Sequence, residues 1–244
     1  MANKWAALLC VLATGVTAES IVPKFHPVSI VDHQYLGGWE HFVGGGLAGF
    51  DCDGDALSEI YAAGGSAEAV LLRNRSDANV RFEADTPEAL RLTGVIGAYP
   101  VDIDSDGVLD LVILRVGENL LMKGGADCSF APFEGIGFDG GERWTTAFSA
   151  TWEDGRVLPT LAFGNYVNRD DPDGPFEACD ENDLFRSNGK QYGERLALTP
   201  GYCSLSMLFS DWGRNGRQDL RVSNDRHYYV RYGQEQMWDM SGAP

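Results

Sequence analysis

The chain has 244 residues, of which 19 are Lys or Arg and 36 are Asp or Glu, so its formal net charge is −17. This acidic balance argues against nucleic acid and anionic membrane surfaces as partners, and it favours divalent cations. The length allows one sizeable hydrophobic core or a short array of repeats.

Residues 1–18 have the features of a secretory signal. Lys4 precedes an apolar run that extends from Trp5 to Val16, and Val16-Thr17-Ala18 offers a small-residue cleavage site. The apolar run is too short to span a bilayer, and no later apolar stretch is long enough to do so. We therefore predict a secreted protein, extracellular or periplasmic, without membrane insertion.

Four cysteines follow the signal: Cys52, Cys128, Cys179 and Cys203. An even number of cysteines in an oxidising compartment favours two disulfides, and four cysteines permit three pairings. The Cys179–Cys203 pair is favoured because these two residues bracket one insertion. Buried free thiols are the alternative.

After the signal, short apolar runs alternate with Gly, Asp and Asn turns, and no long 3.6-residue periodicity appears, which predicts an all-β fold. Residues 19–43 are expected to form a leading strand or part of an incomplete blade. Residues 44–244 contain a repeat whose acidic loops begin near residues 51, 102, 152 and 211. Each repeat is predicted to run strand, acidic loop, strand, turn, strand, often with a fourth strand. The more polar stretch 166–200 is expected to be an enlarged loop.

A four-stranded unit of about 50 residues is what a β-propeller blade requires. One such blade cannot bury both of its faces, so blades must stack against one another.

The clearest acidic loop runs from Asp102 to Asp110. Aspartates occupy its positions 1, 3, 5 and 9 and Gly107 occupies position 6, where a residue without Cβ allows a sharp turn. Ca²⁺ takes six to eight oxygen ligands, and such a loop supplies several of them. Four like charges in nine residues would repel one another without a cation. A metal site is therefore favoured over a solvated acidic turn.

Three stretches together resemble FG-GAP/VCBS repeats, the blade type of integrin α-subunit propellers: GLAGFDCDGDALSEIYAAGG, YPVDIDSDGVLDLVILRVG and SMLFSDWGRNGRQDLRVSND. They are also similar to the repeats of secreted proteins of the cartilage-acidic-protein type. The resemblance covers roughly residues 40–235. It implies a β-propeller, commonly seven-bladed, with Ca²⁺ in the loop between the first two strands of a blade. Four units would make a compact propeller or part of a larger one, and we favour the second.

The resemblance also implies metal ligands, position by position. In the second loop these are the side chains of Asp102, Asp104, Asp106 and Asp110 and the backbone carbonyl of Val108. In the first loop they are the side chains of Asp51, Asp53, Asp55 and Glu59 and the carbonyl of Leu57. Ala56 stands in the first loop where Gly is expected, and a left-handed residue with a Cβ costs about 1–2 kcal/mol.

The other two loops depart from the pattern. In the loop at Asp211, Gly213 removes one acidic ligand, Asn215 replaces another, and Arg214 and Arg217 add positive charge, so an empty structural turn is favoured. The loop near Trp152 has Thr160 in its last ligand position and is predicted to bind no metal.

The four histidines, His26, His33, His41 and His227, belong to no nucleophile–base or zinc motif. We therefore predict a non-enzymatic, calcium-binding module for binding, adhesion or structure, whose partner is an extracellular protein, a matrix or a glycan. The alternative is a propeller-type lyase or hydrolase acting on polysaccharide, which would need His, Lys or Arg beside Trp in one cleft. A scaffold with relic acidic loops is a third possibility.

Overall fold

The computed structural model describes residues 22–225 and 229–241. These residues form fifteen strands in three hydrogen-bonded sheets, and the prediction of an all-β fold is confirmed. Three single-turn 3₁₀ segments accompany them: η1 (Trp39–His41), η2 (Glu88–Leu90) and η3 (Ala126–Cys128). The expected signal, residues 1–18, lies outside the described residues. Within the described part of the chain, no helix is long and apolar enough to cross a membrane.

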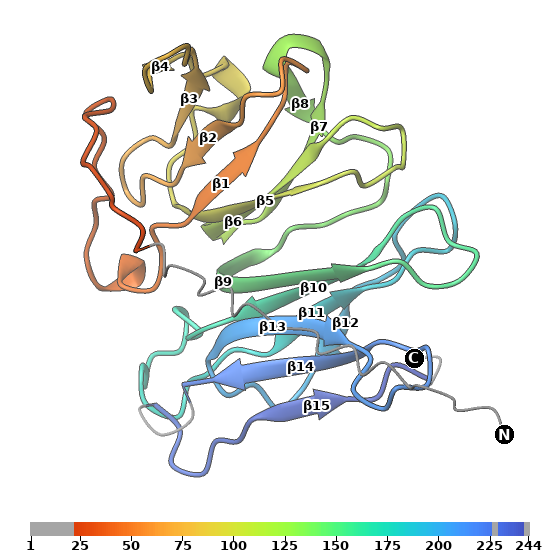
Figure 1. Ribbon diagram of the computed structural model, residues 1–244. Helices are drawn as coiled ribbons and strands as arrows, with labels where there is room; N and C mark the ends of the chain where they lie inside the picture. The colour runs from red at the N-terminus through yellow and green to blue at the C-terminus, as the bar shows by residue number, and fades with distance from the viewer. Residues whose placement is uncertain (1–21, 226–228, 242–244) are drawn as a thin grey trace, which may run out of the picture.

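The strands fall into four units that follow the expected repeat, and Figure 1 shows them in chain order from orange to blue. The first unit contains β1 (Leu47–Phe50), β2 (Glu59–Ala62), β3 (Val70–Asn74) and β4 (Phe82–Ala84). The second contains β5 (Val95–Val101), β6 (Asp110–Glu118), β7 (Leu120–Gly124) and β8 (Phe130–Pro132). The third contains β9 (Glu142–Thr151), β10 (Thr160–Asn165), β11 (Asn182–Phe185) and β12 (Leu196–Leu198). The fourth has three described strands, β13 (Ser204–Ser210), β14 (Asp219–Asn224) and β15 (Gln236–Trp238).

Within each unit, consecutive strands pair antiparallel. An unexpected pairing joins two units: the end of β6 continues beyond its own unit and pairs with β9, Val116 opposite Trp144. The second and third units therefore share one eight-stranded sheet. Each unit contacts the next, but the described strands do not close into a ring of blades.

The expectation that residues 166–200 form one enlarged loop is wrong, because β11 and β12 lie within this stretch and complete the third unit. Its polar composition conceals β11, whose Asn182 and Asp183 are buried and hydrogen-bonded to Asn165 of β10. The Cys179–Cys203 disulfide, as expected, brackets β11 and β12.

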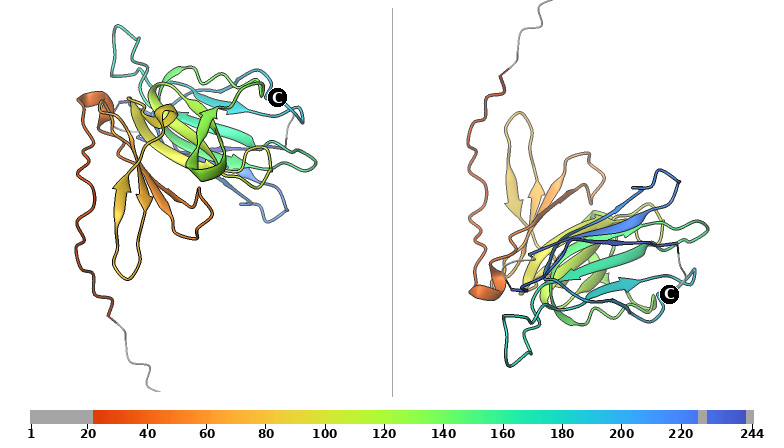
Figure 2. Two further views of the ribbon diagram at one scale, coloured as in Figure 1. Left: turned by 90° about the horizontal axis from the view of Figure 1, so that it is seen from above. Right: turned by 90° about the horizontal axis from the view of Figure 1, so that it is seen from below.

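The described part of the leading segment contains no strand; an isolated bridge between Leu36 and Gly65 and a hydrogen bond between His33 and the carbonyl of Ala63 attach it to the first unit. Residues 22–30 are exposed, and Figure 2 shows this stretch running away from the sheets. The expectation of a leading strand is therefore not met in the described residues of this segment.

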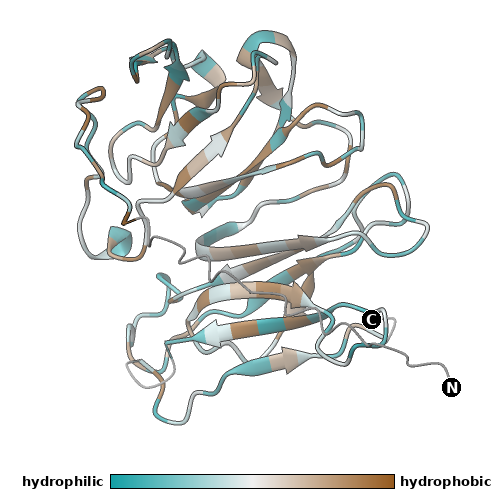
Figure 3. Ribbon diagram, viewed as in Figure 1, coloured by the Kyte–Doolittle hydropathy of each residue, from teal (hydrophilic) through white to brown (hydrophobic). Residues whose placement is uncertain are grey.

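Three hydrophobic clusters lie between successive units, as the stacking argument requires. Strand β6 takes part in two of them: Leu111 and Ile113 pack with the first unit, whereas Val112 and Leu114 pack with the third. A strand that is buried on both faces has a continuous apolar run instead of alternation. Strand β14 of the fourth unit alternates instead: Leu220 and Val222 are buried, and Figure 3 shows hydrophobic and hydrophilic bands along this strand.

Asp183 is a buried acid whose ionisation should make stability depend on pH. Its carboxylate accepts hydrogen bonds from Asn165 (2.8 Å) and Arg195 (2.5 Å), yet burial raises its pKa above the ordinary value. An acid with a raised folded-state pKa stabilises the fold below its unfolded pKa, and this contribution is lost as pH rises through the folded-state pKa.

We therefore expect the stability of the wild type relative to Asp183→Asn to be greater at about pH 4 than at about pH 7. Urea unfolding of both proteins at the two pH values measures this difference. A difference that grows with pH would contradict the prediction.

Candidate metal centres in the acidic loops

The acidic loops of the first, second and fourth units share one backbone conformation. In each loop, positions 4 and 6 have positive φ: Gly54 and Ala56, Ser105 and Gly107, Arg214 and Gly216. The sequence pattern identified position 6 alone. Ala56, with φ of 67°, adopts the left-handed conformation although it carries a Cβ. The shape of the loop is therefore kept even where the expected glycine is missing.

The carboxylate at position 1 closes each of these loops on its own backbone. Asp51 accepts hydrogen bonds from the N–H groups of Gly54 (2.7 Å) and Ala56 (2.9 Å). Asp102 and Asp211 each accept a pair of bonds from the N–H groups of loop positions 5 and 6 instead, at 2.9–3.0 Å. These backbone N–H groups lower the pKa of Asp51 and of Asp211. Position 1 thus orders the loop through hydrogen bonds to the loop's own backbone.

In the first two loops, the carboxylate at position 9 is fully buried and ties the loop to the third strand of its unit. Asp110 accepts hydrogen bonds from the N–H of Ile103, at 2.9 Å, and from the N–H of Gly124 on β7, at 2.8 Å. Burial raises the pKa of Asp110. Glu59 bridges Cys52 and Asn74 in the same way, at 3.2 Å to each N–H. The sequence pattern gave position 9 only as a metal ligand and missed this structural role.

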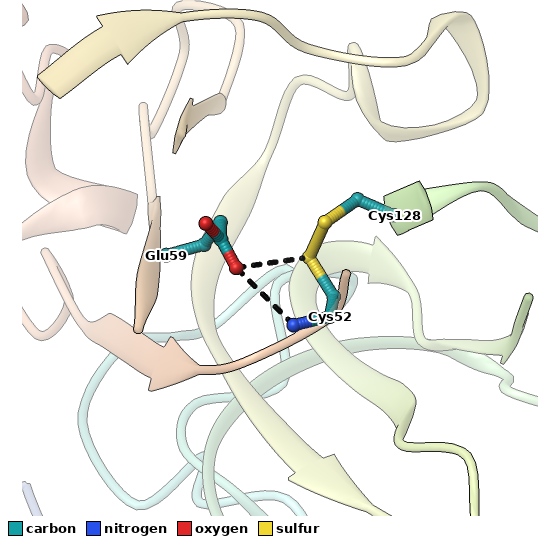
Figure 4. A group of neighbouring side chains, drawn as sticks. All are labelled: Cys52, Glu59 and Cys128. Carbon is teal, nitrogen blue, oxygen red and sulfur yellow. Dashed lines mark hydrogen bonds between the residues drawn. A yellow bond between two sulfur atoms is a disulfide. The ribbon is translucent and has the colours of Figure 1, made fainter. Parts of the chain in front are cut away.

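Figure 4 shows Glu59 beside the Cys52–Cys128 disulfide. Its Oε2 accepts the N–H of Cys52 and lies 3.5 Å from the Sγ of the same residue. Because the two sulfurs are bonded to each other, neither is a thiolate, and this cluster is no cysteine metal site. The disulfide joins the first acidic loop to η3 of the second unit.

Two triads of carboxylates have oxygens within 4.8 Å of one another: Asp51, Asp53 and Glu59, and Asp102, Asp104 and Asp110. Both triads offer only oxygen ligands, which suit hard cations such as Ca²⁺. In the second triad, Oδ1 of Asp104 is buried and accepts no hydrogen bond from any described residue. The residues of the second loop therefore fit a cation that would satisfy this oxygen.

Asp55 and Asp106, the expected ligands at position 5, are not members of these triads. Each accepts a hydrogen bond from the N–H of the residue two places on, Leu57 or Val108, at 2.8 Å. These are the two residues whose carbonyls were expected to bind metal. In this structure, the carboxylate at position 5 therefore stabilises the turn of the loop through a backbone hydrogen bond.

A basic side chain from the third strand reaches into each candidate loop, a feature that the sequence analysis missed. Nζ of Lys123 lies 2.6 Å from Asp104, 2.5 Å from Asp106 and 4.0 Å from Asp110. Burial alone would lower the pKa of Lys123, but the hydrogen bonds to Asp104 and Asp106 outweigh it and raise this pKa. The repulsion between the aspartates is thus offset by a cation of the chain itself.

Arg73 holds the corresponding place in the first loop. Its Nη2 lies 2.7 Å from Asp53 and 2.6 Å from Asp127 of η3. The contact with Arg73 lowers the pKa of Asp127. The sequence signal for both basic residues was present in the third-strand motifs LLRN and LLMK, each of which places one basic residue after an apolar run.

A pocket of about 250 Å³ lies between the acidic loops of the third and fourth units. Trp152, which is 48% exposed, lines it together with Glu153, Arg217 and Met240. Trp144, by contrast, is only 1% exposed and packs in the core. The pocket thus places Arg217 beside Trp152, the arrangement that the polysaccharide-enzyme alternative needs, although none of the described residues that line it is a histidine.

Comparison with known families places a repeat across the two candidate loops. Residues 51–113 match the family described as FG-GAP-like repeat, so the stretch from the first acidic loop into β6 is an FG-GAP-like repeat. No curated protein matches the chain.

Proposed function

We propose, from the FG-GAP-like repeat at residues 51–113, that the chain forms blades of an exported β-propeller that acts as a non-catalytic binding or adhesion module and holds Ca²⁺ in its first two acidic loops. The observation that carries the calcium proposal is the convergence of oxygens from Asp102, Asp104 and Asp110 within 4.8 Å. Export is supported by the two disulfides, which are typical of oxidising compartments.

The partner is an extracellular molecule, and the exposed indole of Trp152 supports a glycan. Indole rings offer large, rigid contact area with a polar edge, and they are enriched at interfaces for this reason. The neighbouring Arg217 adds a cationic group to the same pocket. Ca²⁺ in this proposal orders the acidic loops that form one end of the blades, and it takes no part in a reaction.

Thermal unfolding of residues 19–244 in calcium, magnesium or EDTA tests the calcium proposal. An ion that binds only the folded state stabilises it by about 2.7 kcal/mol at a hundredfold excess over Kd. For a chain of this size, that corresponds to a rise in Tm of roughly 5–10 °C. We expect this rise with millimolar Ca²⁺ and a smaller one with Mg²⁺, which demands a tighter octahedral geometry.

Two matched variants locate the effect. Asp104→Asn should remove the second loop's share of the calcium-dependent rise in Tm, whereas Asp219→Asn in the fourth loop should retain the whole rise. Identical melting curves for the wild type in calcium and EDTA would refute the proposal, and equal losses from both variants would refute the assignment to the second loop.

A further inference from the structure

The strand register identifies one equivalent position in all four units. The residue that follows the ninth loop position pairs with a residue of the third strand: Ile60 with Leu72, Leu111 with Met122, Leu161 with Phe185, and Leu220 with Trp238. The next residue along the third strand therefore lies opposite the ninth loop position. These residues are Arg73, Lys123, Arg186 and Asp239.

In the first three units this position is basic, and its side chain contacts an acid of its own loop. Arg73 lies 2.7 Å from Asp53, and Lys123 lies 2.6 Å from Asp104. In the third unit, Arg186 lies 3.0 Å from Glu153 although that loop has lost most of its acids. In these three units, the basic residue opposite the ninth loop position therefore contacts the acidic loop each time.

In the fourth unit, the strand residue is acidic and the loop residue that it contacts is basic, the reverse of the first three units. Its strand position carries Asp239, and its loop has gained Arg217, whose Nη2 lies 3.9 Å from Asp239. The same loop has Gly213 and Asn215 where the second loop has aspartates. An ion pair between strand and loop is therefore kept in the fourth unit with its signs exchanged, although this loop, with two aspartates and two arginines, has no net charge for the strand residue to balance.

Lys123 differs from Arg73 in how firmly it is held. The Arg73 side chain is 6% exposed and also binds Asp127 of the next unit. The Lys123 side chain is 29% exposed, and its ammonium sits on a flexible four-carbon stem. The cation of the second loop can therefore move out into solvent, whereas that of the first loop is fixed.

We propose that Lys123 is a tethered cation: its ammonium neutralises the second loop in the absence of metal, and an external cation binds there only by displacing it. The displacement of the ammonium by an external cation rests on the proposed calcium function. Ca²⁺ would need oxygen distances of about 2.3–2.6 Å to the carboxylates that the ammonium contacts. Nζ of Lys123 lies 2.6 Å from Oδ2 of Asp104 and 4.0 Å from Oδ1 of Asp110, two of the three triad carboxylates, so the ammonium stands where the ion would have to bind.

The first test uses no metal. In EDTA, Asp104→Asn should lower the Tm of the wild type, because it removes a partner of Lys123. In the Lys123→Met background the same change should raise the Tm, because it relieves repulsion among aspartates that have lost their cation. Methionine keeps an unbranched apolar side chain near the Phe133 ring and removes the ammonium, whose Nζ lies 5.1 Å from the ring centroid. If Asp104→Asn changed the Tm in the same direction in both backgrounds, the proposal that Lys123 neutralises the loop would be overturned.

A control pair shows what an ordinary surface contact does. Arg81 and Glu83 lie 2.7 Å apart and are 61% and 55% exposed. Glu83→Gln should shift the Tm by little in the wild type and in Arg81→Met, because exposed ion pairs contribute little. A sign reversal of equal size in this pair would overturn the special role given to Lys123.

Calorimetric titration with Ca²⁺ tests the displacement. Lys123→Met should bind Ca²⁺ about tenfold more tightly than the wild type at the site that Asp104→Asn removes, since a factor of ten corresponds to about 1.4 kcal/mol. Unchanged or weaker binding would overturn the competition. Absence of binding to both proteins would overturn the proposed calcium sites and the competition together, whereas the measurement in EDTA decides separately whether Lys123 neutralises the loop.

Discussion

Replacement of Cys52 and Cys128 together by serine should lower the free energy of unfolding by about 4 kcal/mol. The bond closes a segment of 76 residues, and the entropy that a disulfide removes from the unfolded chain grows with the length of that segment. The bond also joins two units, because Cys52 lies in the first acidic loop and Cys128 in η3 of the second unit. Urea unfolding under non-oxidising, thiol-free conditions measures the loss.

The second disulfide provides a matched control. Cys179 and Cys203 are 24 residues apart, so their joint replacement by serine should cost about 3 kcal/mol. If the Cys52 and Cys128 variant lost less stability than this control, segment length would not govern the effect. We also expect the first variant to loosen Asp127, which is the neighbour of Cys128 and the partner of Arg73.

The repeat and its loops could be predicted from sequence because their signals are local. The acidic loops recur at intervals of about 50 residues, and each is followed by an apolar run that becomes the second strand of a unit. The loop pattern demands a left-handed residue at position 6, but Ala56 counted there as a departure with a conformational cost, and that the first loop keeps its shape was not predicted. The Cys179–Cys203 bond followed from the way in which these residues bracket a polar stretch.

Features that depend on contacts between distant strands could not be predicted. The pairing of β6 with β9 needs residues about 26 positions apart to meet, and nothing in either segment specifies the partner. Strand β11 was missed because its buried polar residues are satisfied by β10, not by the local chain. The positions of Lys123 and Arg73 in the loops follow from strand register, which a spacing pattern does not contain.

The predicted ligand set contains both carboxylate triads, but it also contains Asp55, Leu57, Asp106 and Val108, which lie outside them, and it gave the acids only part of their roles. The pattern treated every loop acid as a metal ligand, yet positions 1 and 9 also bind backbone N–H groups. A carboxylate has about four acceptor sites, so it can accept such bonds and still bind a cation. The contribution of a loop carboxylate to the fold can therefore be separated from its contribution to metal binding only by measuring stability without metal.

Asp110→Ala should be the most destabilising single change in the second loop, with a loss of about 3 kcal/mol in EDTA. The carboxylate is fully buried, and both of its oxygens accept backbone N–H groups, from Ile103 and Gly124. Hydrogen bonds to charged groups contribute about 1.5–3 kcal/mol each, and an N–H that is left buried without a partner adds a further cost. Urea unfolding of the variant and the wild type measures the loss.

Asp106→Ala is the matched comparison, because Asp106 belongs to the same loop and also contacts Lys123 but is exposed. Its loss in EDTA should be at most about 1 kcal/mol. Asp110→Asn should fall between the two, since one amide oxygen can still accept an N–H while the amide nitrogen faces the other. Equal losses for Asp110→Ala and Asp106→Ala in EDTA would show that position 9 acts through charge alone. A large loss that is specific to Asp110→Ala, by contrast, would make position 9 the element that fixes the loop to its blade before any ion is bound.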